Sequence, residues 1–431
     1  MYLWGNIDFL GAVWYKICTK LIEYNDKSII TKGIVFPFCV LLLYLFREFD
    51  KNANSVDMDT AVMLVILNWF GDYLSLRFLC GYFGSLTFCF KGCQTMIEHS
   101  LVTETSNISQ RIDWIDSLKG FAIFCVTMGH FNMWAPIERY IYSFHMFLFF
   151  FLSGFLFSAK LPQKEMIKKR IKRLLVPFLA WNTVSSFIGF LFEKDTLNLL
   201  EELFVLNGNL MWNAPIWFLL VLFISELFCI LCKLYKQTWI SITTIIISLG
   251  LWILIGDKWL LWKLNLVPMA LSFFLMGYLF KTKISLVRKW IVLLPLGVGS
   301  IIFSSLNIRV VYTTGEFGNY FYCIMAAFCG VLFFVALFSG SKQFSRRSLL
   351  IFWGKNSLLI MALQSFVFQV ISIISIKYLG IDLMNYQSSV VSIALTLFTM
   401  FSISVLIVII KKLTKNIHFL RTIGEAFGIQ Y

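Results

Sequence analysis

Charged residues are scarce in this sequence. Asp, Glu, Lys and Arg together make up 14% of the 431 residues, whereas an ordinary soluble domain carries about 25%. Because hydrophobic residues make up 59% of the chain, we exclude a protein that folds mainly in water. The N-terminus also lacks a short apolar run followed by a small-residue cleavage site, so we expect no removable signal peptide.

Motifs for metal, disulfide or nucleic-acid chemistry are missing as well. Most of the cysteines lie inside apolar stretches, where a thiol behaves as a small hydrophobe. Cys229 and Cys232 have CxxC spacing, but apolar Ile230 and Leu231 separate them, which favours packing over zinc or redox chemistry. The net charge of +14 comes without a helix-turn-helix, RRM or zinc-finger pattern. We therefore predict neither a metal site nor a nucleic-acid partner.

Long apolar blocks are what the sequence contains instead. From residue 111 onward, ten blocks approach the roughly 20 residues that a helix needs to cross the hydrocarbon core. They cover residues 118–134, 140–158, 174–192, 214–232, 238–256, 264–281, 287–305, 319–338, 353–376 and 388–410. The sequence therefore predicts an all-α, polytopic transmembrane helical bundle. We expect about ten core membrane helices, plus one or two N-terminal hydrophobic segments.

Basic residues between these blocks predict the topology. One set of alternate loops holds most of them, including a cluster from Lys160 to Arg173. The other set holds only Arg139, Lys194, Lys258, Lys263, Arg309 and Lys377. The positive-inside rule places the richer set in the cytoplasm. We therefore expect a multi-pass protein of the inner (cytoplasmic) membrane, embedded in the lipid bilayer, with a cytoplasmic C-terminus.

The first 110 residues follow a different pattern. Apolar blocks at residues 34–46 and 61–76 fit either two membrane crossings or one crossing with interfacial helices. A polar stretch at residues 99–110 has the composition of a linker. We therefore divide the chain into an N-terminal membrane-associated extension, residues 1–110, and a transmembrane core, residues 111–431.

Two ionisable residues stand out in the first core segment, because such groups are rare and costly inside a membrane helix. Lys119 and His130 are eleven residues apart, so on an α-helix they share a face to within about 20° and lie roughly 16 Å apart. The topology puts Lys119 near the cytoplasmic end and His130 near the opposite end, where they could hold the two ends of a long ligand. Asp116 is roughly 21 Å from His130 along the helix, so we expect it to support Lys119 or Arg111.

His145 is expected near the same end as His130. It follows a short loop and lies near the outer end of the second segment. A neutral imidazole is the natural general base for removing a proton from a hydroxyl near neutral pH. A histidine near the membrane interface also serves to satisfy a backbone carbonyl or to contact lipid headgroups. Both interpretations stay open for each histidine.

Four further residues in the third and fourth core segments are candidates for the site. Arg170 and Arg173 are neighbours on one helix face and suit phosphate, although ordinary positive-inside flanking explains them at least as well. Trp217 and its neighbours fit an aromatic belt at the outer interface. Glu226 lies deeper in the same segment, where a belt does not explain it. We expect Glu226 to face a polar cavity or a partner rather than lipid.

The stretch from Asp113 to Ser158 resembles the opening of the membrane acyltransferase-3 family, most closely its fucose 4-O-acetylase-like branch. The matching residues there are Trp114-Ile115-Asp116, Lys119-Gly120, Gly129-His130, Ser143-Phe144-His145-Met146 and Phe151-Leu152-Ser153-Gly154. Later matches are Arg170 and Arg173 for the family's Arg-x-x-Arg, Trp217 to Leu219 for its Trp-Phe-Leu, and Gly354, Asn356 and Ser357 for its Gly-x-Asn-Ser. The ordered set extends over residues 111 to about 411.

The resemblance implies a membrane O-acyltransferase. The expected reaction moves an acetyl (acyl) group from cytoplasmic acyl-CoA, here acetyl-CoA, to a hydroxyl of a cell-envelope polysaccharide sugar. The resemblance implies a general base at His130, with His145 as a second catalytic candidate. The coenzyme phosphates are expected to contact Lys119, Arg170 and Arg173. The substrate site or its support is expected to include Asp116, Trp217, Glu226, Asn356 and Ser357.

The chain departs from the family at two positions. Lys119 stands where the family usually has arginine, and a lysine cannot make a planar two-point contact with phosphate. Gln364 stands where many relatives carry a histidine, and an amide cannot act as a base.

The alternative function is a polytopic transporter or flippase of a lipid-linked glycan. Such transporters often contain two-fold internal repeats, which we do not find in this sequence.

Overall fold

The computed structural model describes residues 113–193, 213–284, 290–341, 344, 347–386, 388–415 and 418–429. The chain divides into two units, Met1–Arg111 and Ile112–Tyr431, and the description below concerns the second. Its described residues are mainly helical, and the only β-structure among them is an isolated bridge between Val311 and Glu316. The predicted all-α fold class is confirmed. The predicted N-terminal segments, in residues 1–110, lie outside the described residues.

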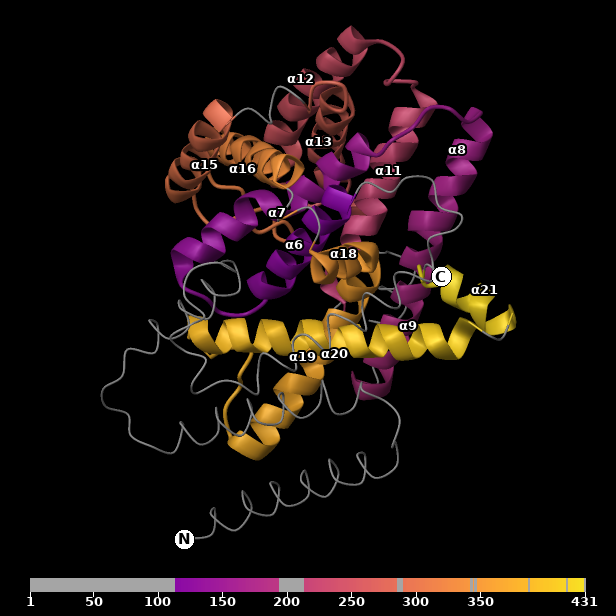
Figure 1. The fold of residues 1–431 in the computed structure, drawn as a ribbon, viewed down its shortest axis with the longest axis vertical. Helices are drawn as coiled ribbons and strands as arrows, with labels where there is room; N and C mark the ends of the chain where they lie inside the picture. Colours follow the sequence, from indigo (N-terminus) through magenta and orange to yellow (C-terminus); the bar gives the residue numbers. More distant parts are fainter. Residues whose placement is uncertain are drawn as a thin grey trace. The chain divides into compact units, whose positions relative to one another are not determined.

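The second unit is a bundle of helices (Figure 1). In chain order they are α6 (Asp113–Gly129), α7 (Ala135–Phe155), α8 (Gln163–Arg170), the π-helix η2 (Ile171–Leu175), α9 (Val176–Glu193), η4 (Ala214–Ile216), α11 (Trp217–Leu231), α12 (Thr238–Ile255), η5 (Leu261–Leu266), α13 (Val267–Phe280), α15 (Trp290–Ser305), α16 (Tyr320–Gly340), α18 (Ser348–Lys355), α19 (Ser357–Leu379), α20 (Ser389–Lys415) and α21 (His418–Ala426). Each predicted membrane segment overlaps a helix of this set.

Several of these helices can cross a membrane. Among the described residues, six helical stretches are long and apolar enough to do so: Ala214–Leu231, Thr238–Ile255, Leu261–Phe280, Tyr320–Gly340, Ser357–Tyr378 and Ser389–Thr414. A shorter apolar stretch, Val292–Ser305, belongs to α15. The chain is therefore a multi-pass membrane protein, while ten core crossings stay a prediction.

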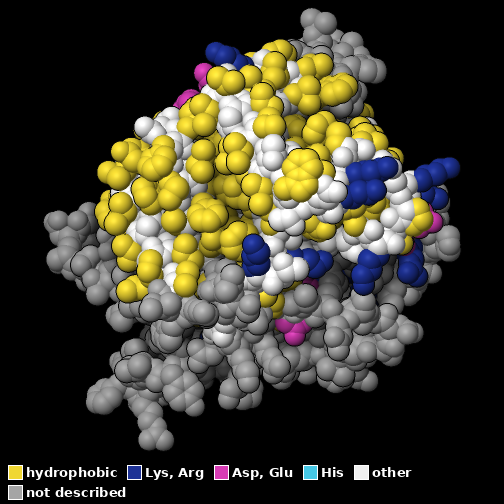
Figure 2. Space-filling model, turned by 90° about the horizontal axis from the view of Figure 1, so that it is seen from above, with side chains coloured by type: hydrophobic (Ala, Val, Ile, Leu, Met, Phe, Trp, Pro, Cys, Tyr) yellow, Lys and Arg dark blue, Asp and Glu magenta, His cyan; other side chains and the backbone are white. Residues whose placement is uncertain are grey.

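The surface of the bundle suits lipid rather than water. α12 buries only Ser241, Ser248 and Trp252 among its residues, and it exposes apolar side chains such as Ile246 and Leu254. This is the reverse of a helix on a soluble protein, which exposes its polar face. Figure 2 shows one face of the molecule, where hydrophobic side chains cover a broad continuous area and Lys and Arg gather mainly toward one side. The apolar area is what a lipid-facing surface requires.

Glycines bring pairs of helices into backbone contact at the centre of the bundle. A Cβ atom on Gly354 of α18 would lie 1.7 Å from the carbonyl oxygen of Asp116 in α6. A Cβ atom on Gly120 would lie 1.9 Å from the carbonyl oxygen of Leu350. Glycines of α7 and α13 make the same kind of contact. Small residues at such crossings are a main source of close helix packing in membranes, and here they fix α18 along the first half of α6.

The first core helix ends earlier than the sequence predicts. α6 begins at Asp113 and ends at Gly129, instead of covering residues 118–134. His130 lies in the turn that follows, where its backbone N–H donates to the carbonyl of Thr127 at 3.3 Å. Pro136 occupies the first turn of α7, a position at which proline favours a helix start. His130 therefore lies one residue beyond the helix, so the prediction that it shares an α-helical face with Lys119 does not apply to it.

Candidate active site

The predicted cation lies in the first half of α6, and the predicted base follows the last residue of the helix. Lys119 is in the second turn of the helix and is partly exposed, while His130 lies in the turn after Gly129. α19 runs beside α6 in the same direction, because Gln364 contacts Thr127 (2.9 Å between Oε1 and Oγ1) and Phe368 contacts His130. The rings of His130 and Phe368 are 5.4 Å apart between centroids. The His130 ring thus faces a neighbouring helix of the bundle.

His145 is the middle residue of α7 rather than a residue near its end, and its side chain is buried. Its Nδ1 is 2.7 Å from the carbonyl oxygen of Ile141. Two tyrosine rings stand edge-on to the imidazole, Tyr142 at 5.0 Å and Tyr312 at 6.0 Å between centroids. If Nδ1 carries the proton and donates to Ile141, Nε2 is the nitrogen left to accept a proton. His145 therefore contacts a backbone carbonyl through Nδ1, which was one of its two predicted roles. Its Nε2 remains the nitrogen for proton transfer.

Trp217 belongs to this aromatic group. It opens α11 and is only 5% exposed, and its ring stacks on Tyr312 with 5.9 Å between centroids and 29° between planes. The hydroxyl of Tyr312 donates to the backbone carbonyl of Tyr142 at 2.8 Å. A tryptophan of an aromatic belt faces the membrane interface, whereas Trp217 faces the protein interior. The Trp217 ring contacts Tyr312, and the Tyr312 ring in turn contacts His145.

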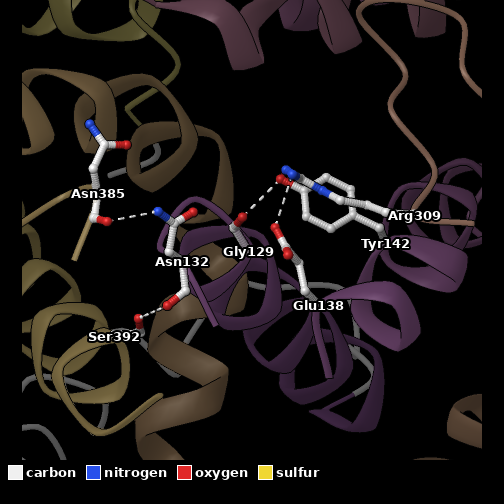
Figure 3. A network of polar contacts seen from close by, with 7 residues as sticks. All are labelled: Gly129, Asn132, Glu138, Tyr142, Arg309, Asn385 and Ser392. Carbon is white, nitrogen blue, oxygen red and sulfur yellow. Dashed lines mark hydrogen bonds and ion pairs between the residues drawn. The ribbon is translucent and has the colours of Figure 1, made fainter. Parts of the chain in front are cut away.

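A polar network surrounds the backbone next to His130 (Figure 3). The hydroxyl of Tyr142 donates to the carbonyl of Gly129 at 2.8 Å. The guanidinium of Arg309 lies over the Tyr142 ring, 4.5 Å from its centroid, and its Nη1 is 3.1 Å from a carboxylate oxygen of Glu138. The sequence did not indicate Glu138, Tyr142 or Arg309 as residues of the site. The one available signal was that Arg309 is among the few basic residues in the poorer set of loops.

The chain after the candidate base is held from its other side (Figure 3). The side-chain amide of Asn132 donates to the carbonyl of Asn385 at 3.1 Å, and Ser392 donates to the carbonyl of Asn132 at 2.6 Å. The backbone N–H of Trp134 donates to the hydroxyl of Ser389 at 3.1 Å. The connection between α6 and α7 is therefore fixed by the start of α20 and the loop before it.

A buried ion pair lies toward the other end of the bundle. The Nε atom of Arg170, at the end of α8, pairs with a carboxylate oxygen of Glu226 in α11. The side chains are 12% and 6% exposed. The Arg170 guanidinium also lies 5.4 Å from the ring centroid of Phe157, which follows α7. The contact between Phe155 and Trp114, with ring centroids 5.4 Å apart, joins the end of α7 to the start of α6. Arg170 therefore lies toward the Lys119 end of α6.

Arg170 and Arg173 do not have the same surroundings. The π-helix η2 begins directly after Arg170 and contains Arg173, which is exposed. Pro177 follows η2, and a proline lacks the N–H that would bond to the carbonyl four residues earlier. A π-helix is rare and occurs mostly as a single turn within an α-helix. Because the expected spacing of two α-helical neighbours does not apply here, one guanidinium is buried against Glu226 and the other lies at the surface.

The family's Gly-x-Asn-Ser residues form the turn between α18 and α19. Gly354 is the point of backbone contact with Asp116. Asn356 is buried, and its side-chain amide donates to the carbonyl of Phe352 at 2.8 Å. Ser357 is the first residue of α19. The turn therefore lies against the start of α6, near Lys119, and its visible contacts are with backbone.

Comparison with known proteins identifies the family. Residues 112–409 match the family model of acyltransferase-3, which is described as an acyltransferase domain. Neither the comparison with curated proteins nor that with solved structures gives a match. The matched region includes every predicted site residue and the helices from α6 to most of α20, and it confirms the predicted family. With its multi-pass helical bundle, the chain belongs to the acyltransferase-3 family and is a membrane acyltransferase.

Proposed function

We propose that this membrane acyltransferase moves an acetyl group from cytoplasmic acetyl-CoA to a hydroxyl of a cell-envelope polysaccharide sugar. The observation that supports this most directly is that Lys119 lies in the first half of α6, whereas His130 follows the last residue of the helix. A cation at one end suits the phosphates of a cytoplasmic donor. An imidazole at the other end suits an acceptor hydroxyl on the far side of the membrane.

The donor end would use cations at two depths. Exposed Arg173 would meet the coenzyme phosphates first, because it lies at the surface of the π-helix. Arg170 is held by Glu226 through Nε, so we assign it a fixed orientation deeper in the protein. Lys119 would contact the donor beside α6, and the thin pantetheine arm would then extend toward His130.

The acyl transfer would be direct. The imidazole of His130 takes the proton of the sugar hydroxyl as its oxygen attacks the carbonyl carbon of the thioester. A C–O bond forms, the C–S bond breaks, and the leaving coenzyme thiolate receives the proton from the imidazolium. No Ser-His-Asp order or nucleophile elbow in the sequence calls for an acyl-enzyme intermediate. The second histidine, His145, would border the acceptor with its Nε2.

The test is an acetyl-transfer assay with purified protein in lipid nanodiscs. Acetyl-CoA labelled in its acetyl group is mixed with surface glycan, and labelled glycan and free coenzyme A are both measured. We expect product from the wild type and none from His130→Ala, with thermal unfolding showing that the variant is folded. Substantial turnover by His130→Ala would exclude this residue as the base. Movement of unmodified glycan without acetylated product would favour the transporter instead.

The acceptor can be identified in cells. Mass spectrometry of surface glycan from cells with and without this protein should show a mass difference of one acetyl group on one sugar. Identical glycans in the two strains would contradict a surface polysaccharide acceptor. The fucose 4-O-acetylase-like branch leads us to examine deoxyhexose sugars first.

A further inference from the structure

His130 needs positioning that α6 does not supply. It lies one residue beyond the helix, and its backbone N–H makes only a 3.3 Å contact to Thr127 within the turn. A general base must point at the proton it removes to within hydrogen-bonding geometry. The direction of this imidazole therefore depends on whatever fixes the backbone immediately before and after it.

Tyr142 fixes the backbone on the Gly129 side. Its hydroxyl donates to the carbonyl of Gly129, which belongs to the peptide unit that links Gly129 to His130. The tyrosine ring also lies close to Gly129, since a Cβ atom there would be 3.0 Å from the ring. The same ring stands edge-on to His145. Tyr142 therefore contacts both the backbone before His130 and the second histidine.

Arg309 and Glu138 hold Tyr142 in place. The Arg309 guanidinium covers the tyrosine ring at 4.5 Å and pairs with Glu138, whose side chain is 14% exposed. Arg309 comes from the connection between α15 and α16, which is anchored nearby because the Tyr312 hydroxyl donates to the backbone carbonyl of Tyr142. A cation over an aromatic ring is attracted by the negative face of the ring. The connection thus supplies a support for the Tyr142 side chain from a distant part of the sequence.

We propose that Tyr142 is a positioning residue for His130, and that Arg309 and Glu138 keep Tyr142 in the orientation that this role requires. The proposal rests on the proposed function, in which His130 is the base. Misplacement of a catalytic group by about 1 Å can cost about 100-fold in rate. We therefore expect Tyr142→Phe to lower kcat by about 10- to 100-fold and to leave the KM for acetyl-CoA unchanged, because the donor cations lie at the other end of α6.

The matched control is Tyr140→Phe. Tyr140 lies two residues away on the same helix and is partly buried. Its hydroxyl contacts the hydroxyl of Ser300 at 3.2 Å, so the variant also loses one hydroxyl contact. Tyr140 does not contact Gly129 in the described structure, so its variant should keep the wild-type kcat. Equal kcat values for Tyr142→Phe and Tyr140→Phe would overturn the proposal.

A second readout does not require transfer activity. The rate at which diethyl pyrocarbonate modifies His130, followed by mass spectrometry, should change in Tyr142→Phe and not in Tyr140→Phe. If the wild type transfers no acetyl group, the proposed function fails, and this measurement alone decides whether Tyr142 controls the surroundings of His130. Equal modification rates in both variants count against the proposal.

Arg309→Gln is a second variant, to be used if Tyr142→Phe has a lower thermal stability than the wild type. It removes the cation over the ring but leaves the tyrosine hydroxyl in the chain. We expect a smaller fall in kcat than for Tyr142→Phe and an unchanged KM for acetyl-CoA. A wild-type kcat in Arg309→Gln would overturn the role given to Arg309.

Discussion

Replacing Gly354 by alanine should separate α18 from α6. The new Cβ atom would lie 1.7 Å from the carbonyl oxygen and 2.6 Å from the carbonyl carbon of Asp116. Ordinary contact for a Cβ atom begins at 3.4 Å, and the obstacle is backbone, which cannot rotate away as a flexible side chain does. One helix must therefore move by roughly 1.7 Å at this point.

Two opposing effects set the size of the change. Forcing an extra methyl group into a well-packed core costs about 1–3 kcal/mol. Alanine in place of glycine within a helix gains about 0.5–1 kcal/mol because the unfolded chain loses conformational freedom. The overlap with backbone places Gly354→Ala at the upper end of the cost, so we expect a net loss of about 2 kcal/mol. The shifted backbone lies three residues before Lys119, so the KM for acetyl-CoA should also rise.

The assay compares two glycine variants by thermal unfolding in the same detergent. Gly250→Ala is the control, because a Cβ atom at Gly250 in α12 has nothing within 4 Å. We expect the unfolding midpoint to fall by several degrees in Gly354→Ala and to stay level or rise slightly in Gly250→Ala. Equal midpoints in the two variants would refute the backbone contact between α6 and α18.

Two further predictions concern the charged residues. Glu226→Gln should destabilise the fold by about 3 kcal/mol, because Arg170 would keep a buried charge without its partner. The control Glu425→Gln breaks the exposed pair with Lys172 and should cost less than about 1 kcal/mol. Equal losses of unfolding free energy in the two variants would contradict the importance of burial. Lys119→Arg should lower the KM for acetyl-CoA in steady-state kinetics, since a guanidinium can contact phosphate at two points, and an unchanged KM would speak against a phosphate contact at this position.

The sequence by itself determined the helical class of this protein and its family. Apolar length is a property of each segment alone, so each predicted membrane segment overlaps a described helix. The helix boundaries differ from the predicted ones, because they depend on local chain geometry. α6 stops at Gly129 where the connection to α7 begins, although apolar residues continue beyond it.

The sequence also predicted that Lys119 and His130 are separated along the first core helix, because the rise per residue of a helix predicts that distance. Which residues meet across helices was decided only by the tertiary structure. Glu226 faces Arg170 and Tyr142 reaches Gly129, while Arg309 arrives from another connection to cover the Tyr142 ring. Periodicity describes the faces of a single helix, whereas these contacts depend on how α6, α7, α8 and α11 cross. The orientation of the candidate base is therefore a property of the folded bundle.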